Sequence, residues 1–117
     1  MKNKLYVFVD PSLSKSKGAA QAVHAVAELG IKDPETLKQW NNETIVILRN
    51  SWENVKSIFK RYVNESTRED GFHDHIIYEA FYDVDLKLDH PTAVAVYPRN
   101  DVQRKFCEEE FKYLPLL

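Results

Sequence analysis

The sequence predicts an α/β protein: a single domain with a mixed four-stranded sheet, helices on both faces and the element order β-α-α-β-α-β-β-α. Short apolar runs, typical of strands that are covered on both faces, recur along the chain. Stretches of helical periodicity separate the first three runs, which favours parallel crossover connections, whereas the last two runs follow one another directly and imply one antiparallel strand. The length of 117 residues suits one domain over residues 1–117.

The first strand is expected over residues 5–9 (LYVFV), an apolar run that ends at Asp10. A helix rich in alanine follows, from about Ser16 to Leu29. Gly30 is expected just past the end of this helix, because glycine readily adopts the left-handed conformation that terminates helices.

A short helix is expected from residues 33–35 (DPE), which supply an N-cap aspartate and a proline at the first helical position. The apolar run at 44–48 (TIVIL) predicts the second strand. Residues 50–53 (NSWE) resemble a capping box at the start of a third helix. The apolar side chains of that helix fall on one face: Val55, Ile58, Phe59 and Tyr62.

The second half of the chain contains the two strands that follow one another. Residues 64–71 are polar and are expected to form a loop. A third strand is expected over 75–82 and a polar connection over 83–91. Residues 93–97 (AVAVY) predict the fourth strand, and a final helix follows to about residue 113.

Composition excludes several classes of protein. No apolar run approaches the roughly 18 residues of a transmembrane helix, and the run at 5–9 is too short for a signal peptide. The single cysteine, Cys107, cannot form an internal disulfide, which agrees with a reducing compartment. We therefore expect a cytoplasmic protein without membrane contact. Acidic residues after Cys107 oppose thiolate formation, so we expect this cysteine to be packed rather than reactive.

The charges are distributed unevenly along the chain. The net charge is −2, but residues 1–62 hold 10 Lys and Arg against 6 Asp and Glu, whereas residues 63–117 hold 6 against 12. A basic half can present a local face that binds anions. The alternative is that the two halves interleave in the fold and their charges average out.

The first helix carries a polar stripe. Lys17, Gln21, His24 and Glu28 follow one another at helical spacing, and we expect this stripe to face outward. The opposing small apolar residues are expected to lie on the sheet: Ala19, Ala20, Val23, Val26 and Ala27.

The start of this helix is a candidate anion site. It follows the carboxyl end of the first strand, the edge where α/β sheets bind ligands. Free backbone N–H groups, Gly18 and the two lysines Lys15 and Lys17 suit a phosphate there. Neither GxGxxG nor GxxxxGK[ST] is present, so dinucleotide and P-loop binding are not supported.

Residues 10–25 (DPSLSKSKGAAQAVHA) resemble the amino-terminal motif of the type 2 peptidyl-tRNA hydrolases, roughly D-L-K-M-G-K-G-K-x-A-A-Q-x-x-H-A. Residues 34–40 (PETLKQW) are similar to the family's P-E-x-L-x-x-W segment, and residues 92–98 (TAVAVYP) to its last strand, T-V-L-G-I-G-P. The ending at 113–117 (YLPLL) is similar to its L-K-L tail. The resemblance spans nearly the whole chain in the family's order.

The resemblance implies an enzyme that hydrolyses the ester between a peptide and the terminal ribose of tRNA, without a metal or cofactor. It also implies a mixed four-stranded sheet, tRNA as the partner and a homodimer. It assigns catalytic roles to Lys17, Gln21, Asp10 and Glu79. It assigns substrate-binding roles to Lys15, Gly18, Ser12 and Asp83. In this scheme Lys17 binds or polarises the ester and a nearby phosphate, while Gln21 orients substrate or water.

Five residues depart from the family's pattern, and two of them, Ser14 and Ser16, replace glycines around the lysines. Ser12 stands where the family has a lysine, Glu79 is the nearest match to the aspartate of its D-A-G-R-T-Q loop, and Asp83 falls on the threonine. Asp83 adds a negative charge that is unfavourable near a phosphate. The competing hypothesis is therefore a non-catalytic module that keeps the fold and binds tRNA, a nucleotide or a protein. A third hypothesis is an enzyme of this fold acting on a different small ester or amide.

Histidines raise the question of a metal or a general base. His73 and His75 have the spacing of one strand face, and His90 follows later, but no set with zinc-ligand spacing accompanies them. We expect these to be loop and strand-edge histidines and expect no metal. His24 is a candidate general base, but its place in the helix favours a packing role.

Aromatic residues raise the question of base stacking. Trp40, Trp52 and Tyr62 have rings suited to stack on bases. Trp40 ends an amphipathic helix and precedes a buried strand, so we expect it in the core.

Overall fold

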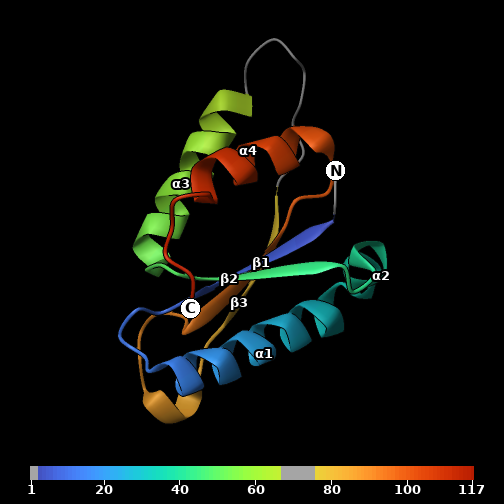
Figure 1. Ribbon diagram of the computed structural model, residues 1–117. Helices are drawn as coiled ribbons and strands as arrows, with labels where there is room; N and C mark the ends of the chain where they lie inside the picture. Colours follow the sequence, from blue (N-terminus) through green and yellow to red (C-terminus); the bar gives the residue numbers. More distant parts are fainter. Residues whose placement is uncertain (1–2, 67–75) are drawn as a thin grey trace.

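Four strands form a mixed sheet across the middle of the protein (Figure 1). The computed structural model describes residues 3–66 and 76–117. Its strands are β1 (Lys4–Val9), β2 (Thr44–Arg49), β3 (Ile77–Phe81) and β4 (Ala93–Tyr97). They lie in the order β2-β1-β4-β3. β1 pairs parallel with β2, and β4 pairs antiparallel with both β1 and β3, which confirms the predicted α/β class with a mixed sheet.

The helices cover both faces of this sheet, as predicted (Figure 1). One face carries α1 (Lys15–Lys32) and α2 (Pro34–Trp40), and the other carries α3 (Trp52–Ser66) and α4 (Asp101–Phe111). A short 3-10 helix, η1 (Val84–Leu86), lies between β3 and β4. In the part of the chain that the structure describes, none of the helices is long and apolar enough to cross a membrane.

Each face of the sheet has its own core, because successive side chains of a strand point to opposite faces. The α1 side adds the rings of Trp40 and Tyr97 to a set of small and aliphatic side chains: Leu5, Val7, Val9, Ala22, Ala25, Leu29, Ala93 and Ala95. The α3–α4 side holds more of the large rings: Tyr6, Phe8, Leu48, Val55, Ile58, Tyr62, Ile76, Val94, Val96, Cys107 and Phe111. The burial of β1 and β4 on both faces explains their uninterrupted apolar sequences.

Helix α1 lies on the sheet with a different face from the predicted one. Its buried residues are Gly18, Gln21, Ala22, Ala25 and Leu29. The prediction that the Ala19, Ala20 and Val23 side of the helix lies on the sheet is wrong, because these three residues are exposed. Gly18 explains why this face of α1 lies on the sheet. A Cβ atom at this position would lie 2.9 Å from Val9 Cγ1 and 3.0 Å from Leu117 Cδ1, so only glycine allows this close approach.

Gly30 also has a packing role, and the prediction that it ends α1 is wrong. The helix continues to Lys32, and the N–H of Asp33 donates to the Leu29 carbonyl at 2.7 Å. A Cβ atom on Gly30 would lie 2.7 Å from Leu37 Cδ1 in α2. Glycine here leaves room for the Leu37 side chain of α2, and Asp33 caps the start of α2 as predicted, accepting from Thr36 N.

The carboxyl-terminal tail covers part of the free edge of β2. The N–H of Arg49 donates to Pro115 O at 2.9 Å, and the N–H of Leu117 donates to Ile47 O at 3.0 Å. These bonds bring Leu117 against Gly18, so the tail, the edge of the sheet and the start of α1 pack as one unit.

Several predicted boundaries move by two or three residues. Helix α3 continues through Ser66, so residues 64–66 are helical rather than part of a loop. β3 begins at Ile77, and α4 ends at Phe111. The rest of the predicted loop, residues 67–71, falls within residues 67–75, which lie outside the described residues.

The basic and acidic halves of the chain interleave. β4, from the acidic half, pairs directly with β1, from the basic half. Ion pairs also join the halves, between Lys4 and Glu108 at 3.3 Å and between Lys32 and Glu79 at 3.0 Å. The structure therefore favours the alternative in which the charges average out.

We expect Gly18→Ala to destabilise the fold, because the new methyl group meets the buried Val9 side chain. Overpacking of this kind costs about 1–3 kcal/mol, against a gain of about 1 kcal/mol in helix propensity. Gly30→Ala is the matched control, since its methyl group meets only the end of the half-buried Leu37 side chain, which can rotate away. The free energy of unfolding, measured in urea, should be lower for Gly18→Ala than for Gly30→Ala by about 1–2 kcal/mol. Equal stabilities would contradict the close approach.

Candidate functional site

Asp10 is the junction of the candidate site at the carboxyl end of β1. Its Oδ1 accepts from the backbone N–H and the hydroxyl of Ser12, both at 2.9 Å. Its Oδ2 lies 2.6 Å from Nε2 of His90. The backbone N–H of Asp10 donates to Thr92 O at 3.0 Å, and its side chain is only 13% exposed. Three interactions therefore fix this carboxylate and a fourth fixes its backbone, and Ser12, a predicted substrate-binding residue, serves here to hold Asp10.

The pKa values of Asp10 and His90 shift in opposite directions. Burial on its own raises the pKa of Asp10, but hydrogen bonds from Ser12 and His90 outweigh it, so the pKa lies below its usual value. Hydrogen bonding to Asp10, and then to Asp89 at 3.2 Å, raises the pKa of His90 above its usual value. The two shifts favour an aspartate–imidazolium ion pair.

Gln21 faces the interior rather than the solvent, so the predicted outward orientation is wrong. Its side chain is buried, its Nε2 donates to Asp83 Oδ2 at 2.9 Å, and its Oε1 accepts from the Thr92 hydroxyl at 2.6 Å. The rotation of α1 that buries Gly18 turns Gln21 toward the connection after β3. Figure 1 shows η1 beside the start of α1. The structure thus joins Gln21 directly to Asp83 and, through Thr92, to the backbone of Asp10.

Thr92 is the residue that sequence reasoning missed. It is 1% exposed; its carbonyl accepts from Asp10, its N–H donates to Phe81 O at 2.9 Å, and its hydroxyl donates to Gln21. The one available signal was a threonine at the start of a fully apolar strand, where an unexplained hydroxyl must find a partner. The sequence does not show which partner.

Lys15 and Lys17 lie in the first turn of α1, next to this network. The Ser14 hydroxyl caps the helix by accepting from Lys17 N at 3.3 Å. Both lysine side chains are exposed, and neither forms an ion pair with another described residue. Two free ammonium groups near a helix amino terminus favour binding of an anion. Gly18 has a packing role in the structure, and its predicted role in that binding stays a prediction.

Glu79 is not brought to the rest of the site. Its carboxylate pairs with Lys32 at 3.0 Å, and Lys32 is the last residue of α1. Lys32 follows Lys17 by 15 residues, or about 22 Å along the helix. The register of β3 against β4 decides this, because Glu79 lies opposite Ala95 at the middle of the edge strand β3, away from the end of that strand.

A cavity of about 490 Å³ opens beside Asp10 and His90 on the α3 side of the sheet. Its walls combine titratable, hydroxyl and aromatic groups: Asp10, His90, Ser51, Trp52, Lys56 and Tyr82. It lies beyond the carboxyl ends of the parallel strands β1 and β2, the usual position of a ligand in an open α/β sheet.

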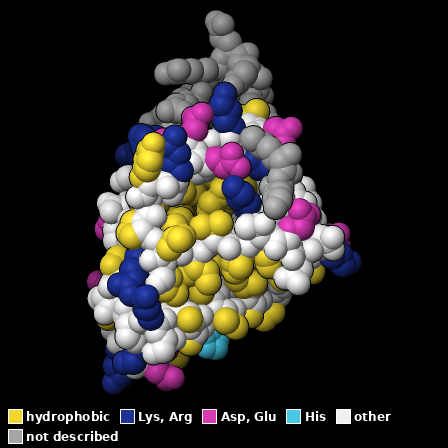
Figure 2. Space-filling model, viewed as in Figure 1, with side chains coloured by type: hydrophobic (Ala, Val, Ile, Leu, Met, Phe, Trp, Pro, Cys, Tyr) yellow, Lys and Arg dark blue, Asp and Glu magenta, His cyan; other side chains and the backbone are white. Residues whose placement is uncertain are grey.

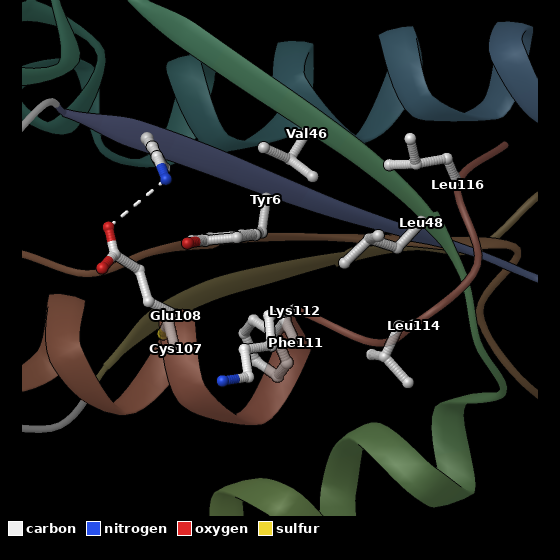
Figure 3. Close-up of a pocket in the computed structure, with 10 residues that line it drawn as sticks. Tyr6, Val46, Leu48, Cys107, Glu108, Phe111, Lys112, Leu114 and Leu116 are labelled. Atoms are coloured by element: carbon white, nitrogen blue, oxygen red, sulfur yellow. Dashed lines mark hydrogen bonds and ion pairs between the residues drawn. The ribbon is translucent and has the colours of Figure 1, made fainter.

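A second hollow, of about 420 Å³, lies between α4, β2 and the carboxyl-terminal tail (Figure 3). Tyr6, Val46 and Leu48 line it from the sheet, and the Lys4–Glu108 ion pair crosses its rim. None of the predicted site residues lines it. It is a partly covered section of the α3–α4 core.

Cys107 lies beside this hollow and is unsuited to nucleophilic chemistry. Its side chain is 0% exposed. Burial, followed by the nearby Glu108 and Glu110 carboxylates, raises the pKa of the thiol to about 12. The prediction of a packed cysteine is confirmed.

An apolar groove of about 410 Å³ runs along the flank of α1 that faces β2. Figure 2 shows hydrophobic side chains gathered over β2 and α1. Val23, Ile31 and Ile45 contribute exposed apolar surface to it. The polar stripe of α1 lies on the opposite flank, against β3. The expected homodimer stays a prediction.

The other candidate side chains have packing roles. The ring of His24 stacks on Phe81 with centroids 4.8 Å apart. Trp40 is buried, and its Nε1 donates to Thr44 O at 2.8 Å, which confirms its place in the core. Tyr62 is buried, whereas Trp52 stays half-exposed at the cavity wall.

No metal-binding cluster is found among residues 3–66 and 76–117, as far as their side chains are described. His73 and His75, the strand-face pair of the metal hypothesis, lie outside that part of the chain. His90, the third member, pairs with Asp10 instead.

Comparison with known proteins does not place this site in a family. No model of a known protein family matches the chain, and no curated protein matches it. The resemblance of residues 10–25 to the type 2 peptidyl-tRNA hydrolases therefore stays a prediction.

We expect Thr92→Val to destabilise the fold by about 1–3 kcal/mol, because it leaves the buried Gln21 carbonyl without its donor. Thr44→Val is the control: the hydroxyl of Thr44 has no hydrogen-bond partner among the described residues, so valine should cost little or stabilise the edge strand. Urea unfolding of the two variants measures the difference. A Thr92→Val variant as stable as Thr44→Val would show that Gln21 does not depend on Thr92.

The His90–Asp10 pair should make stability depend on pH. Because the pKa of His90 is raised on folding, its contribution is complete below the unfolded value of about 6.5 and is lost as pH rises through the folded pKa. The pKa of Asp10 is lowered on folding, so Asp10 stabilises the fold above its unfolded pKa of about 3.9. This stabilisation is lost as pH falls through its folded pKa. Urea unfolding from about pH 5 to about pH 9 should show the wild-type advantage over His90→Gln shrinking toward alkaline pH. A constant difference would contradict an ion pair.

Proposed function

We propose that the carboxyl edge of β1 and the start of α1 form the site of a peptidyl-tRNA hydrolase, which cleaves the ester between a peptide and the terminal ribose of tRNA. The observation that carries the proposal is the network in which Gln21 bonds Asp83 and Thr92, and Thr92 bonds the backbone of Asp10, next to the free ammonium groups of Lys15 and Lys17. The resemblance of residues 10–25 to the family gives the substrate class.

The chemistry of such a site is electrostatic. Ester hydrolysis develops negative charge on the carbonyl oxygen, and an ammonium group placed near that oxygen stabilises the transition state. Lys17 extends from the first turn of α1 with no carboxylate partner among the described residues, so its charge is available to a substrate. Lys15, two residues earlier on the same turn, adds a second charge for the phosphates of the tRNA end.

The second candidate is a binding module without hydrolysis, and one observation favours it. Asp83 and Thr92 already hold both ends of the Gln21 amide. A substrate must displace one of these buried bonds before Gln21 can orient it, which costs free energy. A module that binds the tRNA end through Lys15 and Lys17 needs no such displacement.

Release of peptide from a blocked aminoacyl-tRNA separates the two candidates. We expect wild-type protein to turn over this substrate and Lys17→Ala to lose about 10²–10³ in kcat, as for the removal of one oxyanion donor. Lys105→Ala, in an exposed position on α4, is the matched control because it removes the same charge from the opposite side of the sheet. Loss of turnover in both variants would refute the assignment to Lys17.

Binding of uncharged tRNA at several salt concentrations tests the module. The affinity should fall as salt rises, because phosphate contacts release counterions, and removal of Lys15 and Lys17 together should flatten the dependence. Salt-dependent binding with no turnover by the wild type would establish the binding module, and binding that does not change with salt would exclude both candidates.

A further inference from the structure

The cavity beside Asp10 contains a carboxylate–histidine pair that the resemblance does not include. The pair joins the end of β1 to the connection before β4, with Asp10 Oδ2 and His90 Nε2 2.6 Å apart. Both residues line the cavity of about 490 Å³. Asp10 also anchors Thr92, so this pair and the Gln21 network share one residue.

The two ring nitrogens of His90 have different surroundings. Nε2 faces Asp10, whose side chain is 13% exposed and is held by Ser12. Nδ1 lies 3.2 Å from Asp89 Oδ1, but the Asp89 side chain is fully exposed, so water and a ligand compete with it. A held carboxylate behind an imidazole, with the second nitrogen facing only an exposed and replaceable partner, is the arrangement of a histidine that transfers protons.

We propose that His90 is the general base, and then the general acid, of the ester hydrolysis put forward above, with Asp10 as its positioning residue. The inference rests on that proposed function. Asp10 fixes the orientation of the ring and stabilises its charged form, and the open cavity beside His90 holds the attacking water.

The proton and the bonds balance in two steps. Nδ1 of His90 takes a proton from water while the water oxygen forms a bond to the ester carbonyl carbon. The imidazolium then gives this proton from Nδ1 to the ribose oxygen as the carbonyl carbon–ribose oxygen bond breaks. The products are the free peptide acid and the hydroxyl end of the tRNA, and the neutral imidazole is restored.

The charges around His90 set the pH range in which its imidazole can act as a general base. Asp10 and Asp89 both favour the protonated ring. Elsewhere in the cavity, Glu53 and Lys56 pair with each other at 3.0 Å, and Tyr82 is an exposed hydroxyl. Since the base must be neutral, kcat/KM should rise with pH through an inflection above the usual histidine value of about 6.5.

The experiment measures kcat/KM on peptidyl-tRNA from about pH 5 to about pH 9 for the wild type and three variants. His90→Ala should lose about 10²–10⁴, and free imidazole should restore part of the rate because the cavity is open to solvent. Asp10→Asn should lower the plateau and move the inflection to lower pH, since it removes the carboxylate that holds the proton. His24→Gln, which changes a histidine outside the cavity, should keep the wild-type profile.

Each outcome decides one claim. Turnover by the wild type with His90→Ala equally active overturns the role of His90 and leaves the hydrolase proposal standing. An inflection unmoved in Asp10→Asn, or a folded His90→Ala that imidazole does not rescue, also overturns the inference, because a merely structural role predicts those results. No turnover by the wild type at any pH overturns the hydrolase proposal and this inference with it.

Discussion

Gly18 lets helix α1 approach Val9 and Leu117 with no side chain between them. This contact selects which side of the helix is buried, since Ala22, Ala25 and Leu29 then follow on the same side. The same rotation turns Gln21 inward and leaves the lysines of the first turn in solvent. The arrangement of polar groups at the edge of the sheet therefore depends on one position where a side chain is missing.

Asp10 connects the two polar networks that result. Its backbone N–H reaches Thr92, which holds Gln21, and its carboxylate reaches Ser12 and His90. In the Gln21 network both ends of the amide are already bonded, which makes it a rigid support. In the His90 network the second ring nitrogen meets only the exposed Asp89, beside a cavity. The proton transfer that we propose therefore lies on the α3 side of the sheet, although the sequence motif points to α1.

The fold could be predicted because its strands are buried on both faces, and such strands are continuous apolar runs that are visible in sequence. Cap residues such as Asp33 also acted locally and were recognised. The face of α1 could not be predicted from periodicity, because most of its residues are small and both sides of the helix suit a sheet. Gly30 was misread for a related reason: glycine ends helices and also admits close neighbours, and only the position of Leu37 distinguishes the two uses.

The sequence by itself determined the α/β class, the succession of elements, the capped helix starts and the presence of two lysines after the first strand, because these depend on residues near one another in the chain. The tertiary structure alone decided which polar groups meet. The register of β3 directs Glu79 to Lys32 rather than to Asp10, and the return of β4 beside β1 brings His90 to Asp10 across 80 residues of sequence. A contact over such a distance is set by strand pairing and helix rotation, and neither has a local signature in the chain.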